Sequence, residues 1–265
     1  MERFQLNKED VLLSWGRCTE KEISRDIFRP KVADEEELEK KLDRNQLLIS
    51  VFKHVVREIT CFLDGNYFFL LVDKEGVLLE IESSGEIKEQ VIKSKLQLGI
   101  YFTEESSGTN ANAMAMNLKK PVLVLPEQHY CKLFHKLYCF ALPLSVEDKV
   151  IGYLDISTIG EKLQKELMVI TNLLEEKIAS DYKLVWEQEL QKKNEVQLTG
   201  KQLEILKLFG SGLIEKEVAD RMSCTESNIK YHKKNIFTTL DVTCSREAIL
   251  KAIKLGLIKL EEIDV

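Results

Sequence analysis

The residues with the most distinctive chemistry lie in one short stretch, His129-x-Cys131-x3-His135-x3-Cys139. Imidazole and thiolate groups are common ligands of zinc and iron in proteins. If the stretch is helical, Cys131 and His135 lie one turn apart and Cys139 continues the same face. His129, Cys131, His135 and Cys139 are therefore candidate ligands of a metal ion or an iron–sulfur centre. The favoured alternative is that they are packing residues of a core or pocket, the commoner role of a buried cysteine.

A second stretch is Gly108-Thr109-Asn110, which precedes an alanine-rich run that ends at Leu118. Backbone amides at the N-terminus of a helix can bind an anionic effector. Thr109 or Asn110 can equally cap the helix, which is the commoner use of these residue types. The sequence alone leaves both interpretations open.

The third pattern is a local excess of positive charge near the C-terminus. From Glu226 to Leu240 the basic side chains are Lys230, Lys233 and Lys234, and Glu226 is the only acid. The whole chain carries a formal charge of −6, with 38 Lys and Arg against 44 Asp and Glu. An acidic protein can bind nucleic acid only through a local basic face, and this segment supplies one. The alternative is the ordinary lysine-rich surface of a small helical bundle.

Length and composition limit the class of protein. A chain of 265 residues is long enough for two domains, and 44% hydrophobic residues are enough to build their cores. The longest apolar run, Tyr67–Val72, is far shorter than the roughly 18 residues that span a bilayer. The N-terminus lacks the apolar segment of a signal peptide. Six cysteines without a CxxC pair favour free thiols over a disulfide framework. We therefore expect a soluble, cytoplasmic protein.

The elements that position these residues change period along the chain. Residues 1–43 predict a helical extension, and an amphipathic helix follows over about 44–63. Residues 44–160 as a whole predict an α+β domain, an antiparallel sheet with flanking helices. The predicted strands are 67–73, 77–81, 121–125, 139–145 and 150–157. The segment 129–137, which contains most of the candidate metal ligands, is predicted to be helical.

A long helix is predicted over 161–194, where one apolar stripe persists without a breaker. Such a helix either packs on its own sheet, or its second half leaves the domain and pairs with a copy of itself, and we favour the second. Residues 195–265 predict an all-α unit of four helices. Its second and third helices, 215–222 and 226–240, are joined by a short turn and form a helix-turn-helix, whose second member can enter the major groove of DNA.

The motifs of this unit appear in a fixed order. They are Leu198-Thr199, Glu204-Ile205-Leu206, Gly212-Leu213, Lys216-Glu217-Val218-Ala219, Thr225-Glu226-Ser227-Asn228-Ile229-Lys230-Tyr231-His232, Asn235-Ile236, Leu240, Ser245-Arg246 and Ala248. In this order and spacing the unit resembles the DNA-binding domain of LuxR/FixJ-type regulators. It departs from the family pattern at Gln202, where Glu is usual, and at Asn228-Ile229, where Thr-Val is usual.

This resemblance implies which residues contact DNA. The implied set is Thr225, Ser227, Asn228, Lys230, Tyr231, Lys233 and Lys234. Within it, Lys230, Tyr231 and Lys234 are expected at base edges, and Lys233 and Thr225 at phosphates. The resemblance further implies a homodimer joined through the fourth helix, 246–255, that reads inverted half-sites in double-stranded DNA.

A second set of motifs lies in the N-terminal part. It consists of Ser14-Trp15-Gly16-Arg17-Cys18, Glu104-Glu105-Ser106-Ser107-Gly108-Thr109-Asn110-Ala111, Pro121-Val122, Gln128-His129, Cys139-Phe140-Ala141-Leu142-Pro143-Leu144 and Ile151-Gly152-Tyr153-Leu154-Asp155. Over about residues 8–180 this part resembles the GAF sensor region of acetoin-regulator-type activators. GAF domains bind effectors between the sheet and its helices. The effector-binding residues that we expect are Tyr67, Phe69, Gly108, Thr109, Asn110, His129 and Cys139.

Activators of that type usually continue into an ATPase domain, but the chain contains no GxxxxGK[ST] motif. The sequence therefore predicts a DNA-binding transcriptional regulator rather than an enzyme. A GAF-like domain at 44–160 would sense a small-molecule effector and control the DNA-binding domain at 195–265 through the helix at 161–194. We expect it to act without ATP hydrolysis and to contact RNA polymerase.

Two alternatives remain. The first is a metal, iron–sulfur or thiol redox sensor that uses the cluster of His129, Cys131, His135 and Cys139. The second is a GAF-type thiol reductase, for which Cys61, Cys131 and Cys139 supply thiols. Phosphorelay control is disfavoured, because the N-terminal half does not alternate strands and helices as a receiver domain does.

Overall fold

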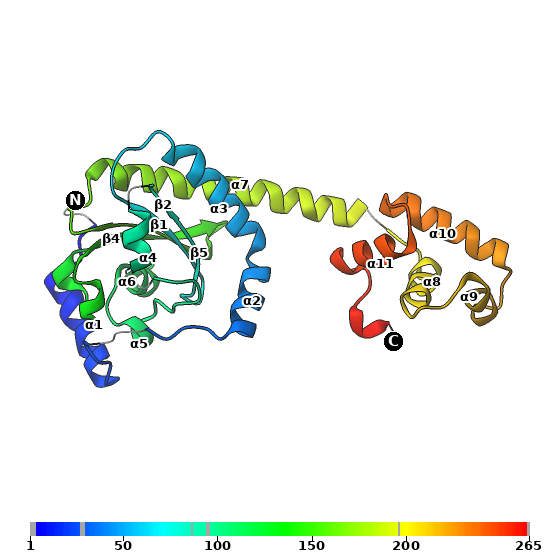
Figure 1. Cartoon of the computed structure of the whole chain (residues 1–265), viewed down its shortest axis with the longest axis horizontal. Helices are drawn as coiled ribbons and strands as arrows, with labels where there is room; N and C mark the ends of the chain where they lie inside the picture. Colours follow the sequence, from blue (N-terminus) through cyan, green and yellow to red (C-terminus); the bar gives the residue numbers. More distant parts are fainter. Residues whose placement is uncertain (1–3, 27–29, 86, 94–95, 196, 264–265) are drawn as a thin grey trace. The chain divides into compact units, whose positions relative to one another are not determined.

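The computed structural model describes residues 4–26, 30–85, 87–93, 96–195 and 197–263. The chain divides into two compact units, Met1–Val185 and Trp186–Val265. The first unit combines a sheet with helices, and the second is helical (Figure 1). The predicted α+β fold class is therefore confirmed. Residues 1–3 and 27–29 of the predicted extension, residues 86 and 94–95 of the predicted α+β domain, and residues 196 and 264–265 of the predicted C-terminal domain lie outside the described residues.

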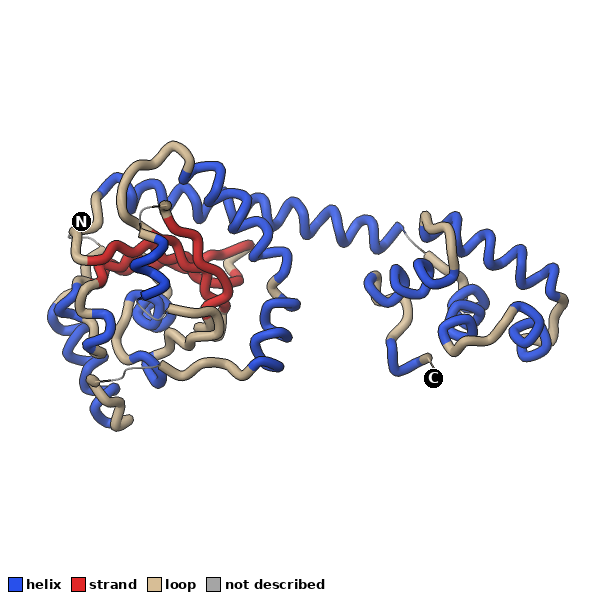
Figure 2. The backbone as a smooth tube through the Cα atoms, in the orientation of Figure 1, coloured by secondary structure: helices blue, strands red, loops and turns tan. Residues whose placement is uncertain are grey.

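The first unit contains one five-stranded sheet with the order β2-β1-β5-β4-β3, and every neighbouring pair is antiparallel. Figure 2 shows these strands in red. The strands are β1 Phe68–Asp73, β2 Leu78–Ser83, β3 Val122–Val124, β4 Leu137–Val146 and β5 Lys149–Ile159. Their sequences are rich in aromatic and β-branched residues, which favour the extended backbone. All five predicted strands are present, within a few residues of their expected ends.

Side chains alternate across this sheet and build one apolar core on each face. Phe68, Leu70 and Cys139 point into the first core, which α1, Lys8–Glu20, and α6, Ala111–Leu118, cover. Tyr67 and Phe69 point into the second core. That core is covered by α3, Gln46–Thr60, and by the first half of α7, Lys165–Glu195.

Shorter elements complete the unit. They are α2 Glu35–Arg44, α4 Lys88–Lys93, α5 Glu104–Ser107 and two 3-10 turns, Pro126–Gln128 and Lys132–Phe134. The predicted helix over 129–137 is therefore wrong. Its backbone amides serve tertiary contacts instead, because Tyr130 N donates to Thr109 O and Lys132 N donates to Arg25 O.

The long helix α7 begins as part of the first unit. Leu167, Leu174 and Ile178 pack into the core under the sheet, whereas Val169 and Leu173 are each 59% exposed. The interpretation as a helix packed on its own sheet is thus correct for the first half of α7. Among the described residues, no helix combines the length and apolar character that crossing a membrane requires.

Beyond the end of α7, the described residues of the second unit form four α-helices and a short 3-10 turn, Leu260–Glu262. The helices are α8 Gly200–Gly210, α9 Glu215–Arg221, α10 Glu226–Leu240 and α11 Ser245–Lys254. Their core contains Ile205, Val218, Ile236 and Ala252. Gln202, where the family pattern usually has Glu, completes the capping box of α8, because its amide oxygen accepts a hydrogen bond from Thr199 N at 2.8 Å.

Candidate functional site

The helix-turn-helix is formed by α9, a short turn and α10. Cys224 N in the turn donates to Ala219 O at 2.9 Å. Thr225 caps α10, since its hydroxyl accepts a hydrogen bond from Asn228 N at 3.2 Å. Ile229 and Ile236 bury the inner face of α10 in the core of the unit. The opposite face of the helix is therefore fixed toward solvent.

That outer face presents donors that suit DNA. Lys230, Tyr231 and Lys234 are exposed, and so are Thr225 and Ser227 at the start of the helix. Lysine ammonium groups can donate to guanine O6 and N7, and exposed amides at a helix N-terminus can bind phosphate. Half-buried Asn228 accepts a hydrogen bond from Lys201 Nζ at 3.1 Å. The structure thus brings six of the seven predicted DNA-contacting residues to the accessible face or N-terminus of α10.

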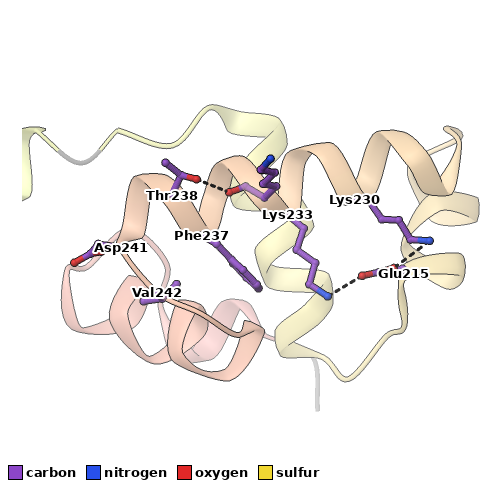
Figure 3. Close-up of a pocket in the computed structure, with 8 residues that line it drawn as sticks. Glu215, Lys230, Lys233, Phe237, Thr238, Asp241 and Val242 are labelled. Atoms are coloured by element: carbon purple, nitrogen blue, oxygen red, sulfur yellow. Dashed lines mark hydrogen bonds and ion pairs between the residues drawn. The ribbon is translucent and has the colours of Figure 1, made fainter.

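Lys233, the seventh, is engaged within the protein. Its Nζ lies 2.7 Å from Glu215 Oε1 (Figure 3). The same Nζ lies 5.3 Å from the centre of the Phe209 ring and 5.8 Å from the centre of the Phe237 ring. Lys230 Nζ is 3.9 Å from the other oxygen of Glu215. The hydrogen bond from Lys233 holds the pKa of Glu215 below its ordinary value. Glu215 was missed from the sequence, because nothing in the sequence pairs the first residue of α9 with α10.

An open hollow of about 440 Å³ lies along the same part of α10 (Figure 3). Its lining residues are Glu215, Lys230, Lys233, Lys234, Phe237, Thr238, Asp241 and Val242. Two lysines of the exposed face, Lys230 and Lys234, therefore border a surface that also contains the carboxylate of Glu215.

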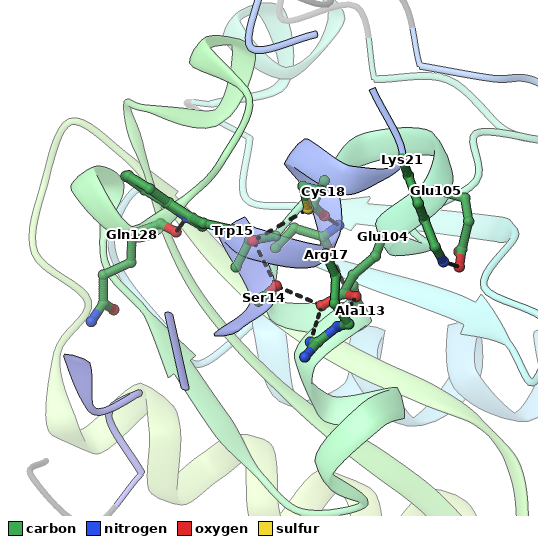
Figure 4. Close-up of polar contacts among 12 residues, drawn as sticks. Ser14, Trp15, Arg17, Cys18, Lys21, Glu104, Glu105, Ala113 and Gln128 are labelled. Carbon is green, nitrogen blue, oxygen red and sulfur yellow. Dashed lines mark hydrogen bonds and ion pairs between the residues drawn. The ribbon is translucent and has the colours of Figure 1, made fainter. Parts of the chain in front are cut away.

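In the first unit, a buried polar cluster ties α1 to the loop before α6 (Figure 4). The Ser14 hydroxyl donates to Glu104 Oε1 at 2.5 Å and lies 2.7 Å from the Thr109 hydroxyl. Arg17 binds both oxygens of Glu104, at 2.8 and 2.6 Å. Cys18 Sγ is 3.8 Å from the Thr109 hydroxyl. The position of Thr109 therefore depends on α1.

The capping interpretation of residues 108–110 is confirmed. Asn110 Oδ1 accepts a hydrogen bond from Ala113 N, and its Nδ2 donates to Phe102 O and Gly108 O. Gly108 has a φ of +65°, and a Cβ there would lie 2.8 Å from the Tyr130 ring.

A second polar centre lies on the face of the sheet that α6 covers. Asp155 on β5 accepts hydrogen bonds from Asn112 Nδ2 at 2.9 Å and from Ser157 Oγ at 2.6 Å. Burial raises the pKa of Asp155 to about 7. Cys139 on β4 lies directly opposite Ser157 on β5 in the sheet. Burial also raises the pKa of the Cys139 thiol. Among the predicted effector residues, only Cys139 belongs to this centre.

Asn112 and Asp155 were not selected from the sequence as site residues. The available signal was the pattern of β5, where Asp155 and Ser157 alternate with Leu154 and Ile156 and must therefore face the same core. Tyr67 and Phe69, which were selected, point into the core on the opposite face of the sheet. Tyr67 and Phe69 therefore lie across the sheet from Cys139, which belongs to the first core.

The candidate metal ligands do not converge. His129 Nδ1 bonds to Leu125 O at 3.0 Å, His135 Nε2 to His129 O at 3.1 Å, and Cys131 Sγ lies 3.7 Å from Ser24 O. Within the part of the chain that the structure describes, no three His, Cys, Asp or Glu side chains are grouped as metal ligands. The spacing failed as a guide because the segment is not an α-helix.

Burial also sets the protonation of these groups. It raises the pKa of Cys131 to about 12 and lowers the pKa of His129 to about 4. At neutral pH Cys131 is therefore a thiol and His129 is neutral. Thiol redox chemistry needs an accessible thiolate, and the environments of Cys131 and Cys139 oppose its formation.

Comparison with known proteins decides the family of the second unit. The model of the family "Bacterial regulatory proteins, luxR family" matches residues 196–252. The C-terminal unit is a LuxR-family helix-turn-helix domain. Over 61 residues the chain is 43% identical to the HTH-type transcriptional regulator AlkS of Pseudomonas putida, a match that covers 23% of this chain and 7% of AlkS.

The relatives of the N-terminal unit are more distant. The chain is 28% identical over 164 residues to the signal-transduction and transcriptional-control protein of Clostridium beijerinckii. This match covers 59% of this chain and 25% of the Clostridium protein. Among solved structures, the E. coli DhaR(N)–DhaL complex contains a similar fold, with a TM-score of 0.62 and 16% identity over 70% of this chain and 63% of that chain. The LuxR-family domain is thus joined to a fold shared with DhaR(N).

Proposed function

We propose that the protein is a sequence-specific DNA-binding transcriptional regulator whose first unit binds a small-molecule effector. The observation that carries the proposal is the exposed face of α10, which presents Lys230, Tyr231 and Lys234 from a LuxR-family helix-turn-helix. Two relatives support a role in transcription: AlkS is named as a transcriptional regulator, and the Clostridium protein as a transcriptional-control protein.

In this proposal the protein acts in the cytoplasm as a homodimer on inverted half-sites of double-stranded DNA, and it contacts RNA polymerase without hydrolysing ATP. The exposed residues Val169, Leu173 and Leu184 support self-association through α7. Val169 and Leu173 are four residues apart, about one helical turn, and Leu184 follows Leu173 by eleven residues, about three turns. All three side chains therefore lie along one side of the helix. A second copy of the chain would cover this apolar stripe.

Effector control would run through α7. This helix follows β5, the strand that carries Asp155, and its first half packs on the sheet. An effector that binds one packing arrangement of the sheet and α7 better than another would shift the population of the two. The DNA-binding domain follows the same helix along the chain and would respond to that shift.

The DNA-binding proposal is tested by fluorescence anisotropy with the full chain. The specific duplex would first be obtained by selection from a random library, and a scrambled duplex of equal length serves as the control. The proposal expects binding of the selected duplex to exceed that of the scrambled one by about a thousandfold at fixed salt, as for other specific regulators. Equal affinity for both duplexes would contradict it.

A further inference from the structure

The polar centre of Asn112, Asp155 and Ser157 has the composition of a binding site. All three residues are only 1% exposed. In the sheet, Asp155 lies between Leu70 on β1 and Ala141 on β4, and both neighbours belong to the apolar core. Polar groups in such surroundings lose their hydration, and they need partners to recover the cost.

The carboxylate of Asp155 has hydrogen bonds but no cationic partner. Its two contacts come from the neutral groups of Asn112 and Ser157, and no basic side chain of the described residues is ion-paired with it. A buried carboxylate without a positive partner is unfavourable in the ionised form. Asp155 therefore has capacity for a further donor or a positive charge.

Asn112 gives the second, independent indication. Its Nδ2 donates to Asp155, but its Oδ1 is buried and has no hydrogen-bond partner. Native proteins rarely leave a buried side-chain acceptor unpaired. When Asp155 is ionised, the groups of this centre with unused capacity, the Asp155 oxygens and Asn112 Oδ1, are all acceptors. A ligand that completes them must bring donors.

We propose that this centre is the effector site of the first unit, and that the effector presents a hydroxyl or ammonium group to Asn112 and Asp155 and carries no negative charge. The inference rests on the proposed function, because it assumes that the first unit binds an effector. It goes further by assigning the residues and the chemistry. An anionic effector is disfavoured, because Asp155 has no cationic partner among the described residues and the centre therefore has no positive charge to stabilise an anion.

The test uses three probes with one carbon skeleton and different polar groups: 1,2-propanediol, 1-amino-2-propanol and lactate. Their binding to the full chain is measured as a shift in melting temperature and by titration calorimetry. A ligand that binds only the folded protein raises its melting temperature. We expect stabilisation by the diol or the amino alcohol and none by lactate. The two donor probes distinguish a hydroxyl effector from an ammonium effector.

Two variants locate the binding. Asn112→Leu removes the amide at similar volume and should weaken the binding of the donor probe about tenfold or more. Asp155→Asn preserves shape and removes the charge, so it should weaken the amino alcohol more than the diol. The matched control is Asn172→Leu on α7, whose amide donates to Met168 O and lies outside the centre. If Asn112→Leu does not fold, Asp155→Asn carries the test.

Three results would overturn the assignment: stabilisation by lactate, no stabilisation by either donor probe, or unchanged binding in both site variants. DNA binding is measured on the same preparations. Specific DNA binding without binding of a donor probe overturns this inference and leaves the DNA-binding proposal intact. Binding of a donor probe without specific DNA binding supports this inference and contradicts the DNA-binding proposal.

Discussion

At the scale of single residues, the lysines of α10 have different roles. Lys230 and Lys234 are exposed, whereas Lys233 is half-buried and paired with Glu215 at 2.7 Å. Charge counted along the sequence treats the three as equivalent. Only the exposed lysines can exchange their hydration for contacts with DNA at low cost.

The first prediction concerns base contacts. Lys230→Ala and Lys234→Ala should each reduce the free energy of binding to the selected duplex by about 1–3 kcal/mol, because each removes a donor to a base edge. Fluorescence anisotropy on the selected and scrambled duplexes measures the loss. An equal loss on both duplexes would show that these lysines contact only phosphates.

The second prediction concerns Glu215. Lys233→Met preserves the aliphatic packing on Phe209 and Phe237. It should change the salt slope of DNA binding by much less than the loss of one phosphate contact, which is about one unit. Glu215→Gln releases the charges of Lys230 and Lys233, and it should strengthen binding to scrambled DNA and steepen the salt dependence. If Lys233→Met instead lowers the salt slope by about one unit, Lys233 binds a phosphate as the family resemblance implies.

The third prediction concerns the pH dependence of stability. The pKa of Asp155 is raised from 3.8 to about 7 in the fold, so the folded state binds this proton more tightly than the unfolded state. The stabilisation is complete below about pH 4 and is lost as the pH rises to about 7. Asp155→Asn lacks this loss, and its free energy of unfolding should increase relative to the wild type across that interval.

Denaturant unfolding at a series of pH values measures the difference between the two proteins. The wild type must be compared with the variant, because His129 changes the free energy of unfolding with pH in the opposite direction. The pKa of His129 is lowered from 6.5 to about 4, so the stability that its neutral form contributes is lost as the pH falls below about 6.5. The nearby Cys139 thiol has a raised pKa and stays protonated over the interval. A difference that does not change with pH would contradict a protonated, buried Asp155.

At the scale of elements, the sequence predicted helices and strands correctly where a regular apolar spacing continued over a whole element. The helices α3, α7 and α10 and the five strands follow from apolar spacing, since each must bury one face. The segment 129–137 was predicted wrongly because the amides of Tyr130 and Lys132 bond to Thr109 and Arg25, residues distant along the chain. The pairing of Glu215 with Lys233 and of Asn112 with Asp155 also depends on tertiary contacts, which one sequence does not reveal.

The fourth prediction concerns α7. Leu173→Glu places a charge in the exposed apolar stripe and should convert the dimer into a monomer without unfolding the first unit, because Leu173 is 59% exposed. Light scattering after size-exclusion chromatography measures the mass, and circular dichroism checks the fold. The matched control is Leu12→Glu on α1, a leucine that is 57% exposed and outside the stripe. A dimer that survives Leu173→Glu would place the interface elsewhere.

At the scale of the whole molecule, the chain joins a LuxR-family domain to a unit with a buried acceptor-rich centre. The formal charge of −6 opposes general binding to polyanions, so DNA binding must come from the local face of α10. We therefore expect the protein to bind its specific DNA site and to bind DNA of other sequences only weakly. The effector would change the population of DNA-competent protein rather than the contacts of α10 themselves.

The most direct test of the central claim is selection of DNA from a random library by the full chain, followed by sequencing, with the Lys230→Ala and Lys234→Ala double variant in parallel. We predict that the wild type enriches one motif arranged as an inverted repeat and that the double variant does not. Absence of any enriched motif from the wild type, or an identical motif from the double variant, would contradict sequence-specific binding through α10.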